Sequence, residues 1–493
     1  MKIKTSNIKM LGIIYLAIPT FIFLVTWLKP IYALLSGVVL IVSTFYVFKH
    51  YLKSDENYIV FPKRMLILIL GVLAVWCFIS GIGGYFYQST DHECRNLILK
   101  NLIEFDWPVV YKNGYFLTYY IGIWLLPALF GKLALITGAG LSIAITISNF
   151  CLWLWILIGI SITYLLIVNY VGEKNNKSKL IILIVFIFFS GCDVLGVILR
   201  NIDFSMHLEW WAKNYQFSSN TTQLFWVFNQ AVPAWIGVML LISDNNLKKD
   251  IFVGSLLLLF SPFPLVGCFV ICIGKLVSIY FIKYKQNKIG ILKEMFSIPN
   301  ILSVIGILPF IAIYLFSNVR VASNPSGING FNTFIGGVSL YNILVLLLFM
   351  VLEFGLYLFI IYKENKKNYL YYICLIFLPI FCMFRFGETN DFEMRGSIPL
   401  LFVLMVLVIQ YLCKHLEINK NAISFSFKGI ALCVVLIIGS ITPFVEMYRG
   451  YYYVRREHRF GILAEEKKEF TIDEYNFIAK NYKGSIFHNT FGK

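Results

Sequence analysis

Apolar runs recur along almost the whole chain, and short polar segments separate them. A helix that crosses a bilayer needs about 20 mainly apolar residues, and the runs come close to that length. Because no water reaches the hydrocarbon core, a spanning segment must satisfy its own backbone hydrogen bonds, which favours helices. The pattern therefore predicts an all-α, polytopic transmembrane bundle of about thirteen helices. The predicted helices lie at 10–28, 31–48, 65–86, 140–170, 180–198, 230–244, 251–265, 266–282, 301–318, 340–362, 369–385, 398–414 and 429–447.

The composition indicates the same class of protein. Hydrophobic residues make up 59% of the sequence and charged residues only 14%, which is far more apolar than a soluble domain. The first apolar run begins near Leu11 and continues to Leu28 without an A-x-A-like cleavage site. We therefore interpret it as a transmembrane helix and not as a signal peptide. The expected location is the cytoplasmic (inner) membrane of a cell, with many passes.

Basic residues predict the orientation of the bundle. Lys and Arg concentrate in short segments between apolar runs, and such segments stay on the cytoplasmic side. With the N-terminus also inside and the C-terminus outside, the inner segments are 49–64, 173–179, 246–250, 283–288, 363–367 and 414–428. The net charge of +16 is thus distributed as in a membrane protein. Its expected anionic neighbours are lipid head groups, with no nucleic acid.

One apolar segment, 115–137, does not fit a simple alternation of crossings. If it crossed the membrane, segment 173–179 and every later basic segment would lie outside. Pro127, Gly131 and Gly138 favour an interruption, so we expect this segment to be re-entrant or interfacial.

The predicted organisation has three parts. An N-terminal transmembrane hairpin with its cytoplasmic loop (1–64) precedes the main membrane domain (65–448), and a short external tail (449–493) follows. The first external loop (87–139) includes the sequence LIEFDWPVVYKNG, which reads as an amphipathic interfacial helix.

The cysteines do not predict a metal site. Most of the ten lie inside apolar runs, where a thiol packs as a small hydrophobe. Cys268 and Cys272 have helical i, i+4 spacing, but no His or second pair accompanies them. We expect neither a metal nor another cofactor.

The first external loop opens with a dense group of charges, QSTDHECRNLILK. Asp91 and His92 follow directly after the predicted helix 65–86. A carboxylate at a helix exit, beside apolar surface, gains basicity by desolvation, as a general base requires. The alternative is that these charges only solvate the loop.

Two further external regions carry candidate residues. Asp193 stands among apolar residues near the outer end of helix 180–198, and an ionisable residue at that depth is a functional candidate, or else a structural hydrogen-bonding group. In RFGETNDFEMRGSIP, Arg395 precedes a helix and is placed to bind phosphate at the membrane surface; its alternative role is an i, i+4 ion pair with Asp391. Arg320 is a second candidate of the same kind.

Several of these motifs resemble the GT-C superfamily of integral membrane glycosyltransferases. The resemblance rests on the acidic start of the first external loop (Asp91-His92), the surface-lying stretch that ends in WPVVY, the segment YYIGIWLLPALFGK and the second external loop opened by Asp193. In addition, FSGCDVLG, SPFPLVG and NDFEMRGSIP are similar to blocks of bacterial membrane proteins of surface-polysaccharide synthesis. The chain departs from many members because it has a single Asp-His where they have paired acids.

The resemblance implies transfer of a sugar from a polyprenyl-phosphate-linked donor to a glycan or lipid-linked acceptor, on the outer face of the membrane. Asp91 would be the general base, and His92, Asp193 and Asp391 would position the acceptor or substrate. Arg395 and Arg320 would bind the donor phosphate. A monophosphate leaving group requires no metal.

Two rival functions remain open at this stage. A polysaccharide polymerase or ligase also works on lipid-linked sugars outside the cell, with a diphosphate-linked oligosaccharide as donor. A flippase or secondary transporter would place ionisable residues in mid-helix, often within internal repeats. Glu353 is the clear mid-helix acid, and no two-fold repeat is evident.

The orientation generates a first prediction. Cysteine substitutions at Asn113 and Ser218 should react with a membrane-impermeant thiol reagent added outside, whereas one at Asn176 should not, because basic segment 173–179 faces the cytoplasm. Outside labelling at position 176 would contradict the re-entrant interpretation of 115–137.

Overall fold

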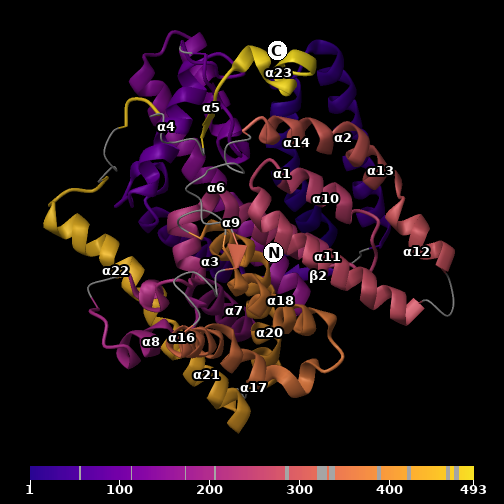
Figure 1. The fold of residues 1–493 in the computed structure, drawn as a ribbon. Helices are drawn as coiled ribbons and strands as arrows, with labels where there is room; N and C mark the ends of the chain where they lie inside the picture. The colour runs from indigo at the N-terminus through magenta and orange to yellow at the C-terminus, as the bar shows by residue number, and fades with distance from the viewer. Residues whose placement is uncertain are drawn as a thin grey trace.

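The protein folds into a helical bundle (Figure 1), and its strands form short two-stranded sheets. The computed structural model describes residues 1–54, 57–112, 114–172, 174–204, 207–283, 288–318, 330–331, 339–385, 390–418, 423–461, 467–470 and 477–493. Within these residues, nine helices are long and apolar enough to cross a membrane, or ten if one bent pair counts as a span. The predicted helical membrane bundle is therefore confirmed as an architecture; the number thirteen and the orientation stay predictions.

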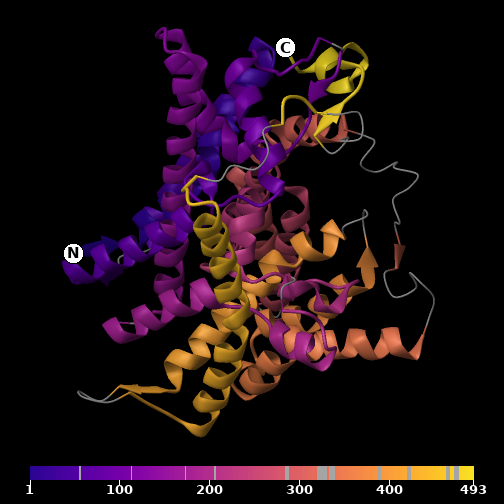
Figure 2. The ribbon, with the colours of Figure 1, turned by 90° about the vertical axis from the view of Figure 1, so that its left-hand side faces the viewer.

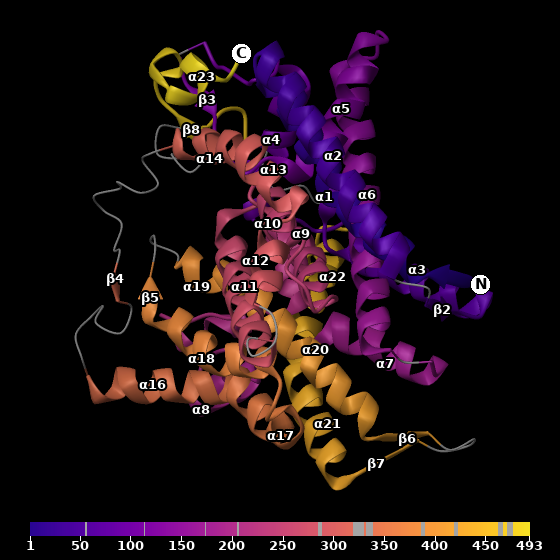
Figure 3. The same ribbon diagram turned by 90° about the vertical axis from the view of Figure 1, so that its right-hand side faces the viewer.

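The first two helices form an antiparallel hairpin. α1 (Thr5–Trp27) is the inner helix and packs on α5, α6, α9 and α10, whereas α2 (Pro30–Ser54) covers it from outside and contacts α13. Strand β1 (Lys2–Lys4) pairs antiparallel with β2 (Tyr58–Val60), with Lys2 opposite Val60. This small sheet closes the hairpin at the end where the N-terminus lies (Figure 3).

The next helices frame the first charged region. After α3 (Lys63–Ile79) and a 3₁₀ turn at Ile82–Gly84, helix α4 (Asp91–Glu104) packs across the hairpin of α5 (Gly122–Ile136) and α6 (Leu141–Val171). Strand β3 (Phe116–Leu117) precedes α5. α5 has 15 residues, and its first amide, that of Gly122, donates to the carbonyl of Leu259 at 3.1 Å. The start of α5 is therefore fixed against the end of α10.

A long, almost fully buried helix runs through the centre of the bundle. α9 (Asn220–Ile242) follows the bent pair α7 (Asn176–Phe188) and α8 (Asp193–Leu199), whose axes differ by 44°, and the 3₁₀ turn η2 (Leu208–Ala212). The predicted start of α9 at residue 230 is wrong by ten residues. Its first two turns are rich in Asn, Thr and Gln, which a hydrophobicity pattern excludes but which are buried here.

The chain from 250 to 282 does not form the two crossings that the apolar pattern predicts. α10 (Asp250–Leu257) has only eight residues, and a break at Leu258–Ser261 separates it from α11 (Pro262–Lys283). Proline lacks an amide hydrogen and is favoured at the first position of a helix, so Pro262 begins a new helix where the hydrophobicity continues unbroken. The boundary predicted at 265 and 266 is therefore wrong.

The remaining elements complete the bundle and its margins. They are α12 (Lys288–Met295), α13 (Ile298–Gly306), α14 (Leu308–Phe316), β4 (Gly330–Phe331), α16 (Leu340–Met350), the π-helix η4 (Val351–Gly355), α17 (Leu356–Asn365), α18 (Tyr369–Met383), β5 (Phe384–Arg385), α19 (Asp391–Gly396), α20 (Ile398–Lys414), β6 (Leu416–Ile418), β7 (Ile423–Phe425), α21 (Phe427–Gly439), α22 (Ile441–Arg456), β8 (Ile478–Ala479), η5 (Tyr482–Gly484) and α23 (Ile486–Thr490).

The connecting segments gather at two separate ends of the bundle. At the N-terminal end, Lys179 Nζ donates to the carbonyl of Val60 and Lys9 pairs with Asp244 at 2.9 Å. At the opposite end, the C-terminal tail pairs β8 with β3 and places α23 against α14. Figures 2 and 3 show the N- and C-termini well apart. The basic segments and the C-terminal tail therefore lie at different ends of the bundle.

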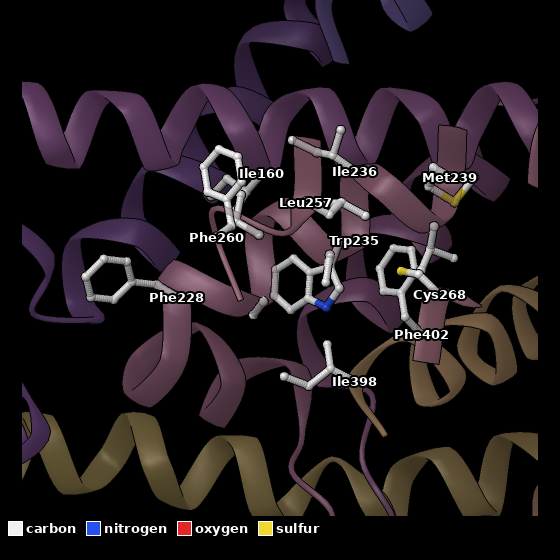
Figure 4. Packing of buried hydrophobic residues seen from close by; sticks show 14 of the residues in the cluster. Ile160, Phe228, Trp235, Ile236, Met239, Leu257, Phe260, Cys268, Ile398 and Phe402 are labelled. Atoms are coloured by element: carbon white, nitrogen blue, oxygen red, sulfur yellow. The ribbon is translucent and has the colours of Figure 1, made fainter. Parts of the chain in front are cut away.

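Trp235 of α9 occupies the centre of the apolar core (Figure 4). Its ring stacks on Phe402 of α20 and on Trp76 of α3, at centroid distances of 5.8 and 6.3 Å. Its indole nitrogen donates to Gln223 Oε1 at 3.2 Å, so the one polar atom of the side chain is satisfied inside the core. Lipid is as apolar as these side chains, so close packing and hydrogen bonds must hold the helices together.

A glycine on α11 lets this helix approach α19 and α20. A Cβ at Gly267 would lie 2.5 Å from the carbonyl oxygen of Gly396 and 2.9 Å from Pro399. Gly267→Ala should destabilise the protein by roughly 1–3 kcal/mol, because backbone atoms must move apart. Thermal unfolding in detergent measures this change. Gly71→Ala in α3 is the control, since nothing lies within 4 Å of its added Cβ; equal melting temperatures for the two variants would contradict the argument.

Candidate functional site

Four charged side chains and two tyrosines gather where α4, the segment before α5 and α19 meet. We call this group the arginine cluster; its members are Asp91, Arg95, Tyr119, Tyr120, Asp391 and Arg395. Both arginines interact electrostatically with both tyrosines, and Asp91 interacts electrostatically with Arg395. Residues separated by about 300 positions in the sequence therefore share one site.

Asp91 is the first residue of α4 and does not follow directly after the preceding helix as predicted, because α3 ends at Ile79. Its Oδ2 accepts a hydrogen bond from Arg95 Nη2 at 2.8 Å, and 39% of its side chain is exposed. The free amides at a helix N-terminus and the guanidinium both stabilise negative charge there. Asp91 is thus a half-open carboxylate in an ion pair, and not the desolvated base that the sequence analysis expects.

Arg95 is the most enclosed cation of the cluster. Only 6% of its side chain is exposed, and its guanidinium lies 5.6 Å from the ring centroid of Phe228. While Nη2 donates to Asp91, Nη1 is buried and has no hydrogen-bond partner among the described residues.

Arg395 links α19 to the segment before α5. Its Nη2 lies 3.1 Å from Asp391 Oδ1, which is the i, i+4 ion pair that the sequence allows. Its Nη1 also donates to the Tyr120 hydroxyl at 3.1 Å. The side chains of Arg395 and Asp391 are 18% and 20% exposed, so a ligand at the surface of the site can reach both.

Residues of α9 and of the break between α10 and α11 fix the Tyr120 hydroxyl by hydrogen bonds. Gln230 Nε2 donates to the Tyr120 hydroxyl at 3.2 Å, and Ser261 Oγ donates to Gln230 Oε1 at 2.8 Å. A chain of hydrogen bonds therefore runs from Arg395 to the break before Pro262. These contacts fix the position of Tyr120. Through Tyr120 they also fix the guanidinium of Arg395.

An apolar cavity of about 560 Å³ adjoins that break. Its lining includes Ser255, Pro262, Leu265, Phe269 and Leu308, and comes mainly from α10, α11 and the α12–α14 region. Phe269 is 62% exposed on this face of the bundle. The cavity therefore offers an apolar surface within a few residues of the hydrogen-bond chain that ends at Arg395.

His92, predicted to position an acceptor, is a buried structural residue. Its Nε2 lies 3.0 Å from the carbonyl oxygen of Phe225 and its Nδ1 3.3 Å from Gln88 Nε2, and the ring stacks on Phe228. Burial, aided by the nearby Arg95 charge, lowers the pKa of His92 to about 4. A neutral imidazole with both nitrogens engaged has no group left for an acceptor.

Asp193 belongs to a second, separate group of ionisable residues, which we call the acid cluster: Asp193, His207, Glu209, Glu353 and Glu446. Asp193 is the first residue of α8 and is 1% exposed. Its Oδ2 accepts from Ser190 Oγ at 3.1 Å and from Thr442 Oγ1 at 2.9 Å. Asp193 thus joins α8 to α22, as the structural alternative in the sequence analysis proposes.

The acid cluster is linked by further hydrogen bonds to tryptophans. Trp211 Nε1 donates to Glu353 Oε1 and Trp226 Nε1 to Glu446 Oε2, both at 3.2 Å. Glu353 lies in the π-helix η4, an irregularity that lets its carboxyl reach the chain at Gly191. Trp211 and Trp226 therefore serve as hydrogen-bond donors to buried carboxylates.

The loop residues of the acid cluster have altered proton affinities. Burial raises the pKa of Glu209 to about 7, against the opposing effect of His207 and with the help of Asp193. Burial lowers the pKa of His207, but the adjacent Glu446 carboxylate, 2.9 Å from Nδ1, more than offsets it, so the net shift is upward.

The two clusters are held together by different contacts: Asp91 pairs with Arg95, whereas Asp193 accepts hydrogen bonds from Ser190 and Thr442. Figure 1 shows α4 and α8, which begin at Asp91 and Asp193, clearly separated. The structure therefore brings together Asp91, Asp391 and Arg395, buries His92 behind them, and places Asp193 elsewhere. Arg320 lies outside the described residues.

Sequence reasoning missed Arg95, Tyr120, Gln230 and Glu209. Arg95 carries a local signal, since it follows Asp91 at the helical i, i+4 spacing. Tyr120 and Gln230 carry none, because their contacts join segments far apart in the chain. In the part of the chain that the structure describes, no group of three or more His, Cys, Asp or Glu side chains is arranged to hold a metal ion.

The raised pKa values in the acid cluster predict a pH-dependent stability. An acid whose pKa is 4.5 when unfolded and about 7 when folded stabilises the protein below pH 4.5 and loses that contribution as the pH rises through 7. The raised pKa of His207 acts in the same direction. The side chain of Glu209→Gln cannot ionise. As the pH rises from 5 to 8, the free energy of unfolding should therefore fall on the order of 1–3 kcal/mol less in this variant than in the unsubstituted protein.

Thermal unfolding in detergent across this pH range tests the expectation. Glu457→Gln, which removes an exposed carboxylate, serves as the control and should follow the unsubstituted protein. If the melting temperature of Glu209→Gln fell with pH as much as that of the unsubstituted protein, Glu209 would be excluded as the source of the pH dependence.

Comparisons with known proteins identify no relative. No protein-family model, no curated protein and no solved structure matches this chain.

Proposed function

We propose that the protein is a membrane glycosyltransferase that moves a sugar from a polyprenyl-phosphate-linked donor to a glycan or lipid-linked acceptor. The observation that carries this proposal is the arginine cluster: a half-exposed carboxylate, Asp91, beside two guanidiniums, Arg95 and Arg395. A lipid-linked sugar is already activated, so the enzyme must supply a base for the acceptor hydroxyl and cations for the departing phosphate. The cluster contains both kinds of group.

The roles within the cluster follow from exposure and contacts. Asp91, the most exposed of the four charged residues, is the proposed general base. Arg395 is the proposed phosphate ligand, because its planar fork can bind two phosphate oxygens and its orientation is fixed through Tyr120. Asp391 keeps its proposed role in positioning substrate, at the same rim. His92 and Asp193 have no part in the proposal, since both are buried and engaged.

The apolar cavity supports a lipid-linked substrate. An isoprenoid chain needs an apolar surface, and the cavity beside Pro262 and Phe269 is lined mainly by apolar side chains. Its end at the α10–α11 break is joined to Arg395 through Ser261, Gln230 and Tyr120. A chain in the cavity would therefore bring its phosphate toward the arginines.

The proposal includes the finer topology predicted from the sequence. With about thirteen crossings or re-entrant segments, the N-terminus inside and the C-terminus outside, α4 and α19 open toward the outer face of the cytoplasmic membrane. Supporting this arrangement, basic segments meet at the N-terminal end, whereas the tail meets the loop before α5. Nucleotide sugars are absent outside, so a lipid-linked donor is the expected one.

Substitution of Asp91 tests the function directly. Asp91→Asn should lower transfer of labelled sugar from polyprenyl phosphate in membranes by about 10²- to 10⁴-fold, because an amide cannot accept the acceptor proton. Stability should change by less than about 1 kcal/mol, since the Asn amide oxygen can still accept the hydrogen bond of Arg95 and position 91 is 39% exposed. Glu93→Gln removes a carboxylate from the same helical turn and should leave transfer unchanged. Near-normal turnover by Asp91→Asn would remove this residue from the mechanism.

A further inference from the structure

Arg95 holds a buried hydrogen-bond donor, Nη1, for which the described residues offer no acceptor. Buried polar groups are nearly always paired, and a donor on a charged group is the most costly to leave without an acceptor. An anionic ligand is the group that would satisfy it.

The surroundings of Arg95 indicate where that anion would bind. Arg95 and Arg395 both interact electrostatically with Tyr119 and Tyr120, so both guanidiniums act on the same pair of tyrosines. The open side of the cluster is at Asp91, which is 39% exposed and occupies Arg95 Nη2. An anion that enters from this side meets Asp91 first and competes with it for Arg95.

Resting on the proposed function, we propose that Arg95 is a second phosphate-binding residue, and that the donor phosphate displaces Asp91 from Arg95 and so frees Asp91 to act as the base. In the resting protein Asp91 Oδ2 accepts a hydrogen bond from Arg95 Nη2, so the ion pair occupies an oxygen that the acceptor hydroxyl would need. A phosphate offers the guanidinium two oxygens in a matching geometry and replaces the single Nη2 contact.

The exchange accounts for all parts of the transfer step. The acceptor oxygen forms a bond to the anomeric carbon of the sugar, and the bond from that carbon to the phosphate oxygen breaks. The acceptor proton passes to the released Asp91 carboxylate, and the phosphate leaves with the bonding electron pair, held by Arg95 and Arg395. No oxidant, reductant or metal enters the balance.

Direct binding of lipid phosphate tests the assignment of Arg95. Purified full-length protein in nanodiscs would be titrated with polyprenyl phosphate, polyprenyl diphosphate and neutral polyprenol. Arg95→Gln should weaken binding of the phosphorylated lipids by about 10- to 100-fold, the loss of a charge-assisted hydrogen bond. Arg95→Lys should recover part of the affinity, because it keeps the charge and loses the fork. Arg455→Gln, which removes an exposed arginine on α22, is the control and should bind like the unsubstituted protein.

A double-mutant cycle tests the displacement of Asp91. Asp91→Asn removes the competitor for Arg95, so it should bind polyprenyl phosphate several-fold more tightly. If the competition is for Arg95, the same substitution in an Arg95→Gln background should have no further effect. If Asp91→Asn tightened lipid-phosphate binding in both backgrounds, the cause would be long-range repulsion between Asp91 and the phosphate. That result would overturn the displacement step.

The outcomes separate this inference from the proposed function. Normal lipid-phosphate binding by folded Arg95→Gln, with loss in Arg395→Gln, would overturn the role of Arg95 and leave the transferase proposal standing. Equal binding of polyprenol and both phosphorylated lipids by the unsubstituted protein would overturn both. Tighter binding of the diphosphate would support the phosphate site and favour the polymerase or ligase class of donor. Melting temperatures of every variant identify those that fail to fold, and Arg95→Lys then decides the result.

Discussion

In lipid, a polar or charged group must find its partners within the protein, and this constraint organises the whole bundle. Its clearest expression is the buried polar beginning of α9. Asn220 Nδ2 donates to the carbonyl of Phe186, and Thr221 Oγ1 accepts from Trp76 Nε1 and donates to the carbonyl of Ile187. These bonds attach α9 to α3 and α7 at fixed positions. The helix at the centre of the bundle is therefore located by hydrogen bonds as well as by packing.

The position of α9 in turn determines the arginine cluster. Phe228 lies beneath Arg95 and His92, and Gln230, two residues later, holds the Tyr120 hydroxyl. Trp226 contacts Glu446 of the acid cluster from the same short stretch, next to the kink at Val227. One distorted segment of a single helix thus supports both groups of ionisable residues. A shift of this segment would disturb the site and the acid cluster together.

The buried cations differ in how completely they are satisfied, and this difference separates structural from functional candidates. Lys275 Nζ donates to both oxygens of Asp250 and to the carbonyl of Leu241, at 2.7 to 3.1 Å, so all three of its donors are used. Such a pair serves to join α11 to α10. Arg95 is also buried, yet its Nη1 has no partner among the described residues. A fully paired charge stabilises the fold, whereas an incompletely paired one is suited to a ligand.

The sequence by itself determined the membrane architecture, because long apolar runs have no stable place in water and can satisfy their backbone only as helices. It also pointed to Asp91, Asp391 and Arg395, since charges bordering apolar helices stand out locally. It did not locate the break before Pro262 or the start of α9. A hydrophobicity pattern does not report where a helix is interrupted within an apolar run, or which polar side chains are buried. Only the tertiary structure placed Arg395 beside Tyr120 and Asp193 beside Ser190 and Thr442. Those relations depend on which helices pack together, and packing partners are set by contacts between residues hundreds of positions apart.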